Sequence, residues 1–312
     1  MPSVYCCCNN YICDVIHLNF KEKTEEQGIK KTVAVAIFII FLLSCLLFFV
    51  LPVHRPFISS GIKAVWIEPE ATPNWTPATY TIPPSILTNL GNGKVQLVMI
   101  DVGYWNGINL IYSYTDNQMT NMIDALRSAD PNVIIQATVW SEYGNDTTDI
   151  SVSANIQYMI NQSVECVGKG FDGYNDDLEG YTGSIQNYIS WLNGMSSAVQ
   201  AIGKSSSGDI GYEDAAYSSE IHLNYSVVMM YGGLPLNEQT LKSSENTILL
   251  DSASPVIIGL LEASSPSLAT QLSWVSQQLN TNTSANYAGV AVFSTESMTE
   301  PDWSTFNAAI PS

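Results

Sequence analysis

The stretch GFDGYNDDLEG, residues 170–180, reads like a barrel strand but carries four acidic side chains within eight positions. Side chains two positions apart on a strand share a face, so we expect Asn175, Asp177 and Glu179 to point together, inward. The even-numbered side chains, including Asp172, are expected to point toward helices or the rim. Like charges held close raise each other's pKa, so one carboxyl can stay protonated while its neighbour stays ionised.

Strand patterns recur along the chain, with amphipathic helical patterns between several of them. The expected strands are 63–68, 95–103, 133–140, 170–179, 209–213, 225–231, 255–262 and 288–294, and the expected helices are 117–129, 155–169, 185–202 and 267–279. Thr115 or Asp116 is the expected N-cap of the first helix. Eight strands alternating with helices over about 250 residues predict an α/β fold, a (β/α)8 TIM barrel. A doubly wound open sheet is the alternative, but the chain lacks the glycine motifs of nucleotide-binding sheets.

The segment TVAVAIFIIFLLSCLLFFVLPV, residues 32–53, is 22 residues long and carries no charge. It is long enough to span a bilayer as a helix, and a buried core helix is the alternative. Four lysines precede it, which predicts a cytoplasmic N-terminus and an extracellular remainder. We therefore expect a cytoplasmic tail (1–31), a transmembrane signal anchor (32–53), a linker (54–60) and an extracellular barrel (61–312).

The part of the chain from residue 56 onward carries six Lys or Arg against 25 Asp or Glu, a net charge of −19. This balance argues against nucleic-acid binding and would suit an acidic medium. The same part has one histidine, His222, and one cysteine, Cys166. A histidine-rich zinc site and a Ser-His-Asp triad are therefore disfavoured, and we expect no metal and no cofactor.

Acids and aromatic residues gather where the expected strands end, which is where barrel enzymes place their active sites. The candidate substrate contacts are Trp66, Asp101, Trp105, Trp140, Glu142, Asn175, Glu213 and Glu262. A protonated carboxyl beside an ionised one, with aromatic faces for sugar rings around them, is the chemistry of glycoside hydrolysis.

The segment from Asp172 to Glu179 resembles the D-G-x-D-x-D-x-E motif of family-18 glycoside hydrolases, the chitinase-like barrels, with Asn175 in place of the second Asp. The resemblance implies that Glu179 is the general acid and that Asp177 holds the substrate's N-acetyl group in a substrate-assisted mechanism. It also implies that Tyr231, in the sequence MMYG, hydrogen-bonds the acetyl carbonyl. Phe293 stands where the family has a tryptophan under the sugar.

These patterns predict a membrane-anchored extracellular glycoside hydrolase that acts on N-acetylhexosamine-containing glycans. Two alternatives stay open. One is a catalytically inactive glycan-binding protein on a degenerate barrel. The other is a retaining two-carboxylate glycosidase that uses Glu179 and Glu262.

Overall fold

The computed structural model describes residues 61–68, 80–93, 95–141, 148–230, 249, 251–262, 266–281, 286–293 and 295–309. All of them belong to the unit Arg55–Ser312. The expected tail, transmembrane segment and linker (1–31, 32–53 and 54–60) lie outside the described residues. Among the residues that are described, no helix is both long and apolar enough to cross a membrane.

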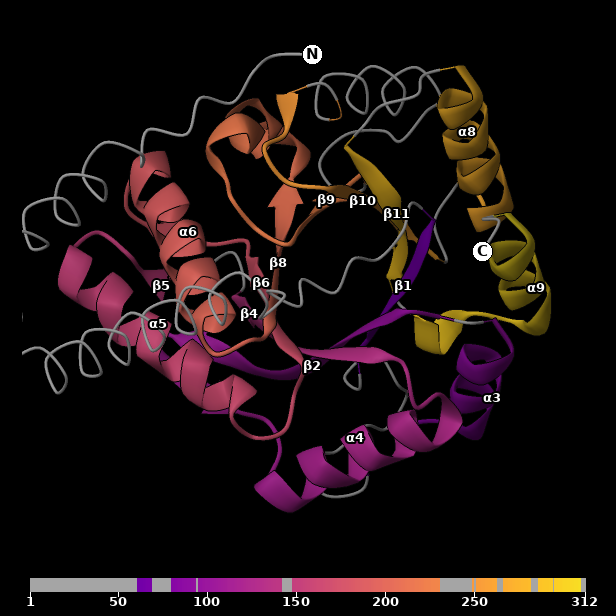
Figure 1. Cartoon of the computed structure of the whole chain (residues 1–312), viewed down its shortest axis with the longest axis horizontal. Coiled ribbons are helices and arrows are strands. Elements are labelled where there is room, and N and C mark those ends of the chain that lie inside the picture. Colours follow the sequence, from indigo (N-terminus) through magenta and orange to yellow (C-terminus); the bar gives the residue numbers. More distant parts are fainter. Residues whose placement is uncertain are drawn as a thin grey trace, which may run out of the picture. The chain divides into compact units, whose positions relative to one another are not determined.

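Within the described part of the chain, eight parallel strands form a closed ring, which confirms the predicted barrel (Figure 1). In ring order they are β1 (Ile62–Ile67), β2 (Leu97–Asn106), β4 (Ile134–Ser141), β6 (Gly173–Leu178), β8 (Ser205–Gly211), β9 (Tyr225–Met229), β10 (Val256–Leu261) and β11 (Tyr287–Phe293). The ring closes because β1 pairs in parallel with both β2 and β11. A short strand, β3 (Asn109–Tyr112), adds antiparallel to β2, while β5 (Thr148–Asp149) pairs with β7 (Tyr181–Thr182).

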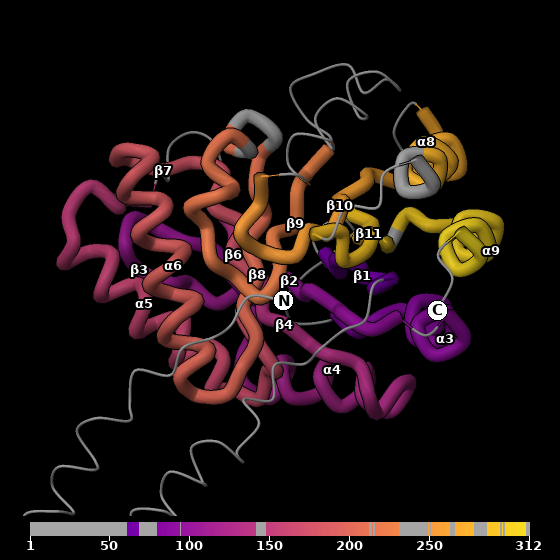
Figure 2. Tube along the Cα trace, turned by 45° about the horizontal axis from the view of Figure 1, so that its top comes forward, coloured from indigo at the N-terminus to yellow at the C-terminus, as the bar shows by residue number. Residues whose placement is uncertain are grey.

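Helices surround the ring, as Figure 1 shows. They are α3 (Pro84–Gly93), α4 (Asp116–Ala129), α5 (Ser153–Val167), α6 (Ile185–Ala201), α8 (Leu268–Thr281) and α9 (Glu300–Ala309). In Figure 2, α5 and α6 lie on one side of the ring, and α3, α9 and α8 lie on the other. The four expected helices are confirmed, and Thr115 caps α4 in a capping box with Gln118. Helices α3 and α9 were not predicted from the sequence. A 3-10 helix, η2 (Tyr212–Glu220), follows β8.

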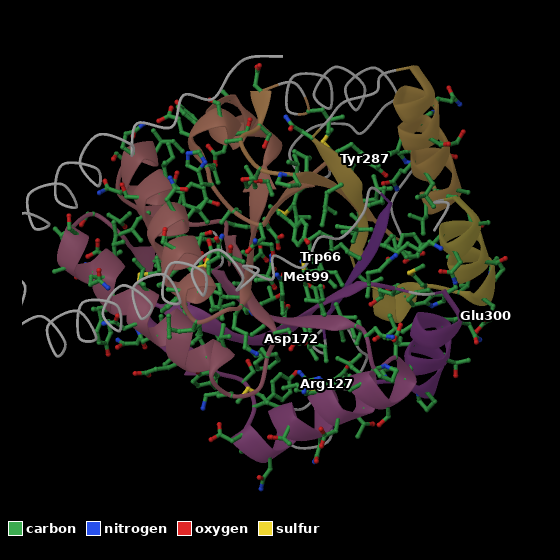
Figure 3. All side chains as sticks on the ribbon, in the orientation of Figure 1. Trp66, Met99, Arg127, Asp172, Tyr287 and Glu300 are labelled. Carbon is green, nitrogen blue, oxygen red and sulfur yellow. The ribbon has the colours of Figure 1, made fainter. Side chains whose placement is uncertain are left out.

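The strands separate two apolar clusters, one inside the ring and one between the ring and the helices. The inner cluster comprises Ile62, Ala64, Trp66, Leu97, Met99, Tyr225, Val227, Ile257, Ala288 and Ala291. Trp66 and Met99 can be seen near the centre of the ring in Figure 3. The outer cluster is larger and includes the apolar faces of α4, α5 and α6. Each strand therefore buries both of its faces, as parallel strands do.

Asp172, the first acid of the 170–180 segment, holds the start of β6 in place from outside the ring. Its Oδ1 pairs with Nη2 of Arg127 on α4 at 2.9 Å, and its Oδ2 accepts a hydrogen bond from the backbone N–H of Ile135 at 3.1 Å (Figure 3). The Nζ of Lys204 lies 3.9 Å from Oδ1. This acid therefore joins α4, β4 and β6 and lies away from the expected site.

Gly173, which follows Asp172, lies where β6 runs against β8. A methyl group at this position would collide with the backbone carbonyl and the side-chain oxygen of Ser205. The glycine of the motif is therefore required by the close approach of two strands.

We expect Gly173→Ala to lower the free energy of unfolding by about 1–3 kcal/mol, the usual cost of overpacking a tight interior. Urea unfolding of the full-length chain, followed by tryptophan fluorescence, measures this, because all seven tryptophans lie after residue 54. The control is Gly203→Asn, since Gly203 has φ of +76° and open space around it. Asparagine tolerates that conformation, so the control should change stability by less than about 1 kcal/mol. Equal stability of Gly173→Ala and the wild type would contradict this account of the motif.

Candidate active site

Strand β6 presents the side chains of Asn175 and Asp177 to the interior of the ring, as predicted, whereas Phe171, before the strand, packs in the outer cluster. Asn175 is fully buried, and its side-chain partners all come from interior positions of neighbouring strands. Asp177 follows at the end of β6, and Glu179 lies just beyond it as an exposed residue. Tyr174 packs in the outer cluster, which confirms that the even-numbered side chains point to the helices.

A directed set of hydrogen bonds holds Asn175 and a further acid, Asp209, in the interior. The hydroxyl of Thr138 on β4 donates to Oδ1 of Asn175 at 3.0 Å. The Asn175 Nδ2 group donates to Oγ of Ser207 at 2.9 Å and to Oδ1 of Asp209 at 3.0 Å, both on β8. The indole N–H of Trp66 on β1 donates to the other oxygen of Asp209, Oδ2, at 3.0 Å. Asp209 is therefore bonded through both oxygens.

Asp209 is not among the predicted site residues, because the strand was expected to begin at residue 209, whereas β8 begins at Ser205. The residues before Asp209 are SSSG, a polar run that does not resemble a buried strand. It is buried here because Ser205 and Ser207 bond the interior side chain of Gln136. The local sequence carries no signal for this strand start. It could have been predicted, and Asp209 with it, only if the polar partner Gln136 had been known to face the same interior.

The carboxyl of Asp177 lies among other acids. Burial raises its pKa well above the usual range, and the charges of Glu179 and Asp176 raise it further. The residue as a whole is half-buried, but its Oδ1 is fully buried and accepts no hydrogen bond from the described part of the chain. Burial also raises the pKa of Asp209, as does the charge of Asp177, while the hydrogen bonds from Asn175 and Trp66 act in the opposite direction. Asp177 and Asp209 therefore favour a state in which they are not both ionised.

Two aromatic side chains, Tyr104 and Trp140, lie beside this group of acids. Trp140 on β4 is the register partner of Asp177 on β6, and Tyr104 on β2 is the register partner of Trp140. The two rings are tilted at 39° with their centroids 5.6 Å apart, and both residues are half-buried. They form a partly open aromatic surface next to Asp177.

The structure does not bring Trp105 to the site, because the register of β2 shifts between Asp101 and Gly103. Beyond this β-bulge the alternation is reversed, so Tyr104 takes the inner side and Trp105 the outer side. Trp105 is fully buried in the outer cluster, where its ring meets that of Trp191 edge-on at 5.7 Å. The predicted role of Trp105 in substrate contact is replaced by a role in the core, and Tyr104 is the residue that the prediction missed.

A second aromatic pair lies at the ends of β1 and β11. The rings of Trp66 and Phe293 meet edge-on, with centroids 6.0 Å apart. Gly259 on β10 leaves room for the indole, since a Cβ there would lie 3.2 Å from Cη2 of Trp66. Trp66 is almost fully buried, whereas Phe293 is half-buried. Trp66 thus acts mainly as the donor that fixes Asp209.

Only some of the remaining predicted contacts lie among the described residues. Asp101 is buried on β2, in register with Thr138, and Glu262 is half-buried directly after β10. Glu142, Tyr231 and the side chain of Glu213 lie outside the described part of the structure. Within the described ranges, no group of three or more His, Cys, Asp or Glu side chains is placed to hold a metal ion.

Asp176 is a buried acid on the opposite side of β6. It is fully buried, and neither carboxyl oxygen makes a regular hydrogen bond. Burial raises its pKa from 3.8 to about 7, and the nearby indole N–H of Trp191 on α6 opposes the rise. Asp176 therefore faces the helices, as the alternation predicted, and stays neutral in the folded chain in mildly acidic solution.

The fold is shared with solved structures, although no protein-family model and no curated protein matches the sequence. A chitinase from Chromobacterium violaceum ATCC 12472 is 10% identical over 80% of this chain and 99% of its own, with a TM-score of 0.60. The spore cortex-lytic enzyme SleL of Bacillus megaterium QM B1551 is 12% identical over 81% of this chain and 74% of its own, with a TM-score of 0.60. A mutant class V chitinase from Nicotiana tobaccum in complex with NAG4 is 13% identical over 65% of this chain and 67% of its own, with a TM-score of 0.50. At such identities the likeness shows the fold alone, and for the fold it confirms the resemblance to chitinase-like barrels.

The buried Asp176 should make the barrel less stable as the pH rises. Its folded-state pKa of about 7 is above the unfolded value of 3.8, so the folded chain binds more protons between these values. The stability contribution of Asp176 is then fully present below about pH 4 and is lost as the pH rises to about 7. We expect Asp176→Asn to gain stability relative to the wild type across this window, by up to about 1.4 kcal/mol for each pH unit.

Urea unfolding at a series of pH values measures that difference, and its pH dependence separates the effect of charge from any constant cost of the amide. The control is Asp124→Asn, because Asp124 is exposed on α4. Its difference from the wild type is measured over the same pH series and serves as the reference for an exposed carboxyl. A constant difference for Asp176→Asn would show that Asp176 does not titrate differently on folding.

Proposed function

We propose that this chain is a membrane-anchored extracellular glycoside hydrolase that acts on N-acetylhexosamine-containing glycans. The observation that carries the proposal is the placement of Asp177 at the inner end of β6 in a closed barrel, with Glu179 exposed just beyond the strand and close enough for the two charges to interact. A closed barrel with acids at the carboxyl ends of its strands is a common architecture for active sites. The fold neighbours named above include two chitinases and a cortex-lytic enzyme.

Glu179 is the general acid in this proposal. It is exposed at the end of β6, where a substrate can reach it, and its charge is opposed by that of Asp177. A proton on Glu179 removes this repulsion and is available for the glycosidic oxygen. When the bond between that oxygen and the anomeric carbon breaks, the leaving hydroxyl keeps the proton.

Asp177 orients the N-acetyl group of the substrate, whose carbonyl oxygen attacks the anomeric carbon as the leaving group departs. The acetamido nitrogen gains positive charge in this step, and a carboxylate that accepts its N–H stabilises that charge. Water then opens the cyclic intermediate and returns a proton to Glu179, so the atoms and charges balance. Tyr231, which lies outside the described residues, is assigned the hydrogen bond to the acetyl carbonyl.

The aromatic side chains supply the surface for sugar rings. Tyr104 and Trp140 are half-buried beside Asp177, and flat aromatic faces bury the apolar faces of such rings. Phe293 and Glu262 lie at the ends of neighbouring strands and are the further contacts that we assign. The complex of the Nicotiana tobaccum protein with NAG4 supports this class of ligand for the fold.

The segment 32–53 is the proposed anchor, with residues 1–31 in the cytoplasm and the barrel outside the cell. The support is its 22 uncharged residues and the lysines that precede it. An extracellular position would give the barrel access to glycans of a cell surface or of the surroundings.

The assay that tests the activity is hydrolysis of N-acetylglucosamine oligomers by the full-length chain and by Glu179→Gln. Loss of a general acid costs about 100-fold to 10,000-fold in rate, so we expect at least a 100-fold fall in kcat with little change in folding. The control is Glu165→Gln, an exposed residue on α5, which should keep the wild-type rate. Product analysis should show retention at the anomeric carbon.

Other outcomes of this assay would support the alternatives. Binding of the oligomers without turnover, unchanged in Glu179→Gln, would make the chain a glycan-binding protein. Equal losses in Glu262→Gln and Glu179→Gln, with trapping of a glycosyl group on the protein, would favour the two-carboxylate route.

Cell fractionation tests the anchor. We expect the full-length chain to stay with membranes after an alkaline carbonate wash and the barrel to be digested when protease is added to intact cells. The double substitution Leu42→Arg and Leu43→Arg should release the chain, because charged side chains at the centre of a span are costly. Leu42→Ile is the matched control and should remain in the membrane. Release of the wild-type chain by the wash would refute the anchor.

A further inference from the structure

Asp177 and Asp209 occupy equivalent positions on two paired strands. The register of β6 and β8 pairs Asn175 with Ser207 and Asp176 with Gly208. Asp177 and Asp209 are the next residues along the two strands, and both point into the ring. The two carboxyls are thus placed side by side by the pairing of the strands, and the charge of Asp177 acts on Asp209.

The two carboxyls differ in the donors that they receive. Asp209 accepts N–H groups on both oxygens, from Asn175 and from Trp66, each at 3.0 Å. Asp177 has a buried Oδ1 to which none of the described residues donates. Hydrogen bonds to a carboxylate favour its ionised form, so Asp209 is the better place for a negative charge and Asp177 is the better place for a proton.

We propose that Asp177 and Asp209 form an acidic pair that shares one proton, and that Asn175 is a positioning residue that holds Asp209 in the pair. The pair itself rests on the geometry, while its use in catalysis rests on the function proposed above. When Asp177 accepts the acetamido N–H of a substrate, its proton passes to Asp209, and the total charge of the pair is unchanged.

This pair gives Asn175 a purpose. An amide at this position cannot share a proton, but it can donate to an acid on the next strand. The second acid of the pair then comes from β8 instead of β6. Where the D-G-x-D-x-D-x-E motif has its second Asp, this chain has Asn175. In the proposed pair, Asp209 on β8 takes the place of that acid, so a proton can still be held beside Asp177.

Several other titratable groups lie near Asp177 and Asp209 and can influence the pKa of the pair. Glu179 lies past the end of β6, Asp176 is on the other side of that strand, and Asp101 faces the interior from β2. The hydroxyl of Tyr188 on α6 lies 3.4 Å from the backbone oxygen of Asp209. Apart from Asp177, the charges that raise the pKa of Asp209 include that of Asp176.

The test is infrared spectroscopy of the protonated carboxyl C=O band in the full-length chain as a function of pH. All variants carry Asp176→Asn, so that the second buried acid of β6 does not contribute to the band. In this background we expect a carboxyl band that persists well above the ordinary titration range of aspartate, near pH 4. Asp177→Asn should abolish it. Asp209→Asn should lower its midpoint by at least about one pH unit, because a like charge is removed.

The exchange variant, Asn175→Asp with Asp209→Asn, provides the matched control. In it the new amide at 209 can donate to the new carboxylate at 175 and still accept the N–H of Trp66, so the hydrogen bond between the two positions is kept. The exchange should restore the high midpoint, whereas a purely structural role of Asp209 would not be rescued. This variant keeps the hydrogen bond between positions 175 and 209. If Asp209→Asn alone does not fold, the exchange variant still tests whether Asp177 shares a proton with a second acid.

An unchanged midpoint in Asp209→Asn, or no recovery in the exchange variant, would overturn the inference. Hydrolysis of N-acetylglucosamine oligomers is measured on the same samples, and the acid limb of kcat/KM should move with the infrared midpoint. If no variant hydrolyses the oligomers, the proposed function fails while the infrared result still decides the pair. If hydrolysis occurs without any infrared shift, the pair alone is wrong.

Discussion

Closure of the parallel strands into a ring is the constraint on which the rest of this structure depends, because inward side chains then have mainly one another as partners. On β1, β2, β9, β10 and β11 the interior is largely apolar. On β4, β6 and β8 it is polar, and a run of hydrogen bonds joins Gln136, Thr138, Asn175, Ser207 and Asp209. Buried polar groups of this kind are stable only when they are bonded, so the direction of each bond restricts the next. The position of Asp209 follows from this network.

The same network decides which acids can carry charge. Among the described side chains, Asp209 receives two donors, Asp177 has a buried oxygen that receives none, and Asp176 has the nearby indole of Trp191. Burial alone would raise the pKa of all three side chains, and the donors reduce this effect to different extents. Three aspartates on the paired strands β6 and β8 therefore differ in the donors that they receive, because each lies at a different place in the pairing or on a different side of its strand. The separation of roles proposed for the site is a consequence of backbone alternation and pairing.

Much of the fold was predictable because alternation and strand spacing are properties of the sequence itself. The eight strands, four of the helices, the cap at Thr115 and the inward position of Asn175 follow from local patterns. Features that depend on pairing between strands did not. The bulge after Asp101 exchanges the positions of Tyr104 and Trp105, and no residue there marks it. The polar start of β8 looks unlike a strand until Gln136 is placed beside it. For this reason the prediction of the site found the acids of β6 but not Asp209.

The buried acids give a physical reason why the stability of this acidic chain should depend on pH. Asp176, Asp177 and Asp209 bind protons more tightly in the folded chain than in the unfolded chain, since burial raises the pKa of each. Their combined effect is to favour folding as the pH falls toward the ordinary range of carboxyls. The excess of acids acts in the same direction, because 25 acids against six bases after residue 56 give a net negative charge whose self-repulsion weakens when carboxylates are protonated. The proposed pair of Asp177 and Asp209 is also more fully protonated at lower pH. An acidic surrounding would therefore suit the stability, the surface and the chemistry of this barrel together.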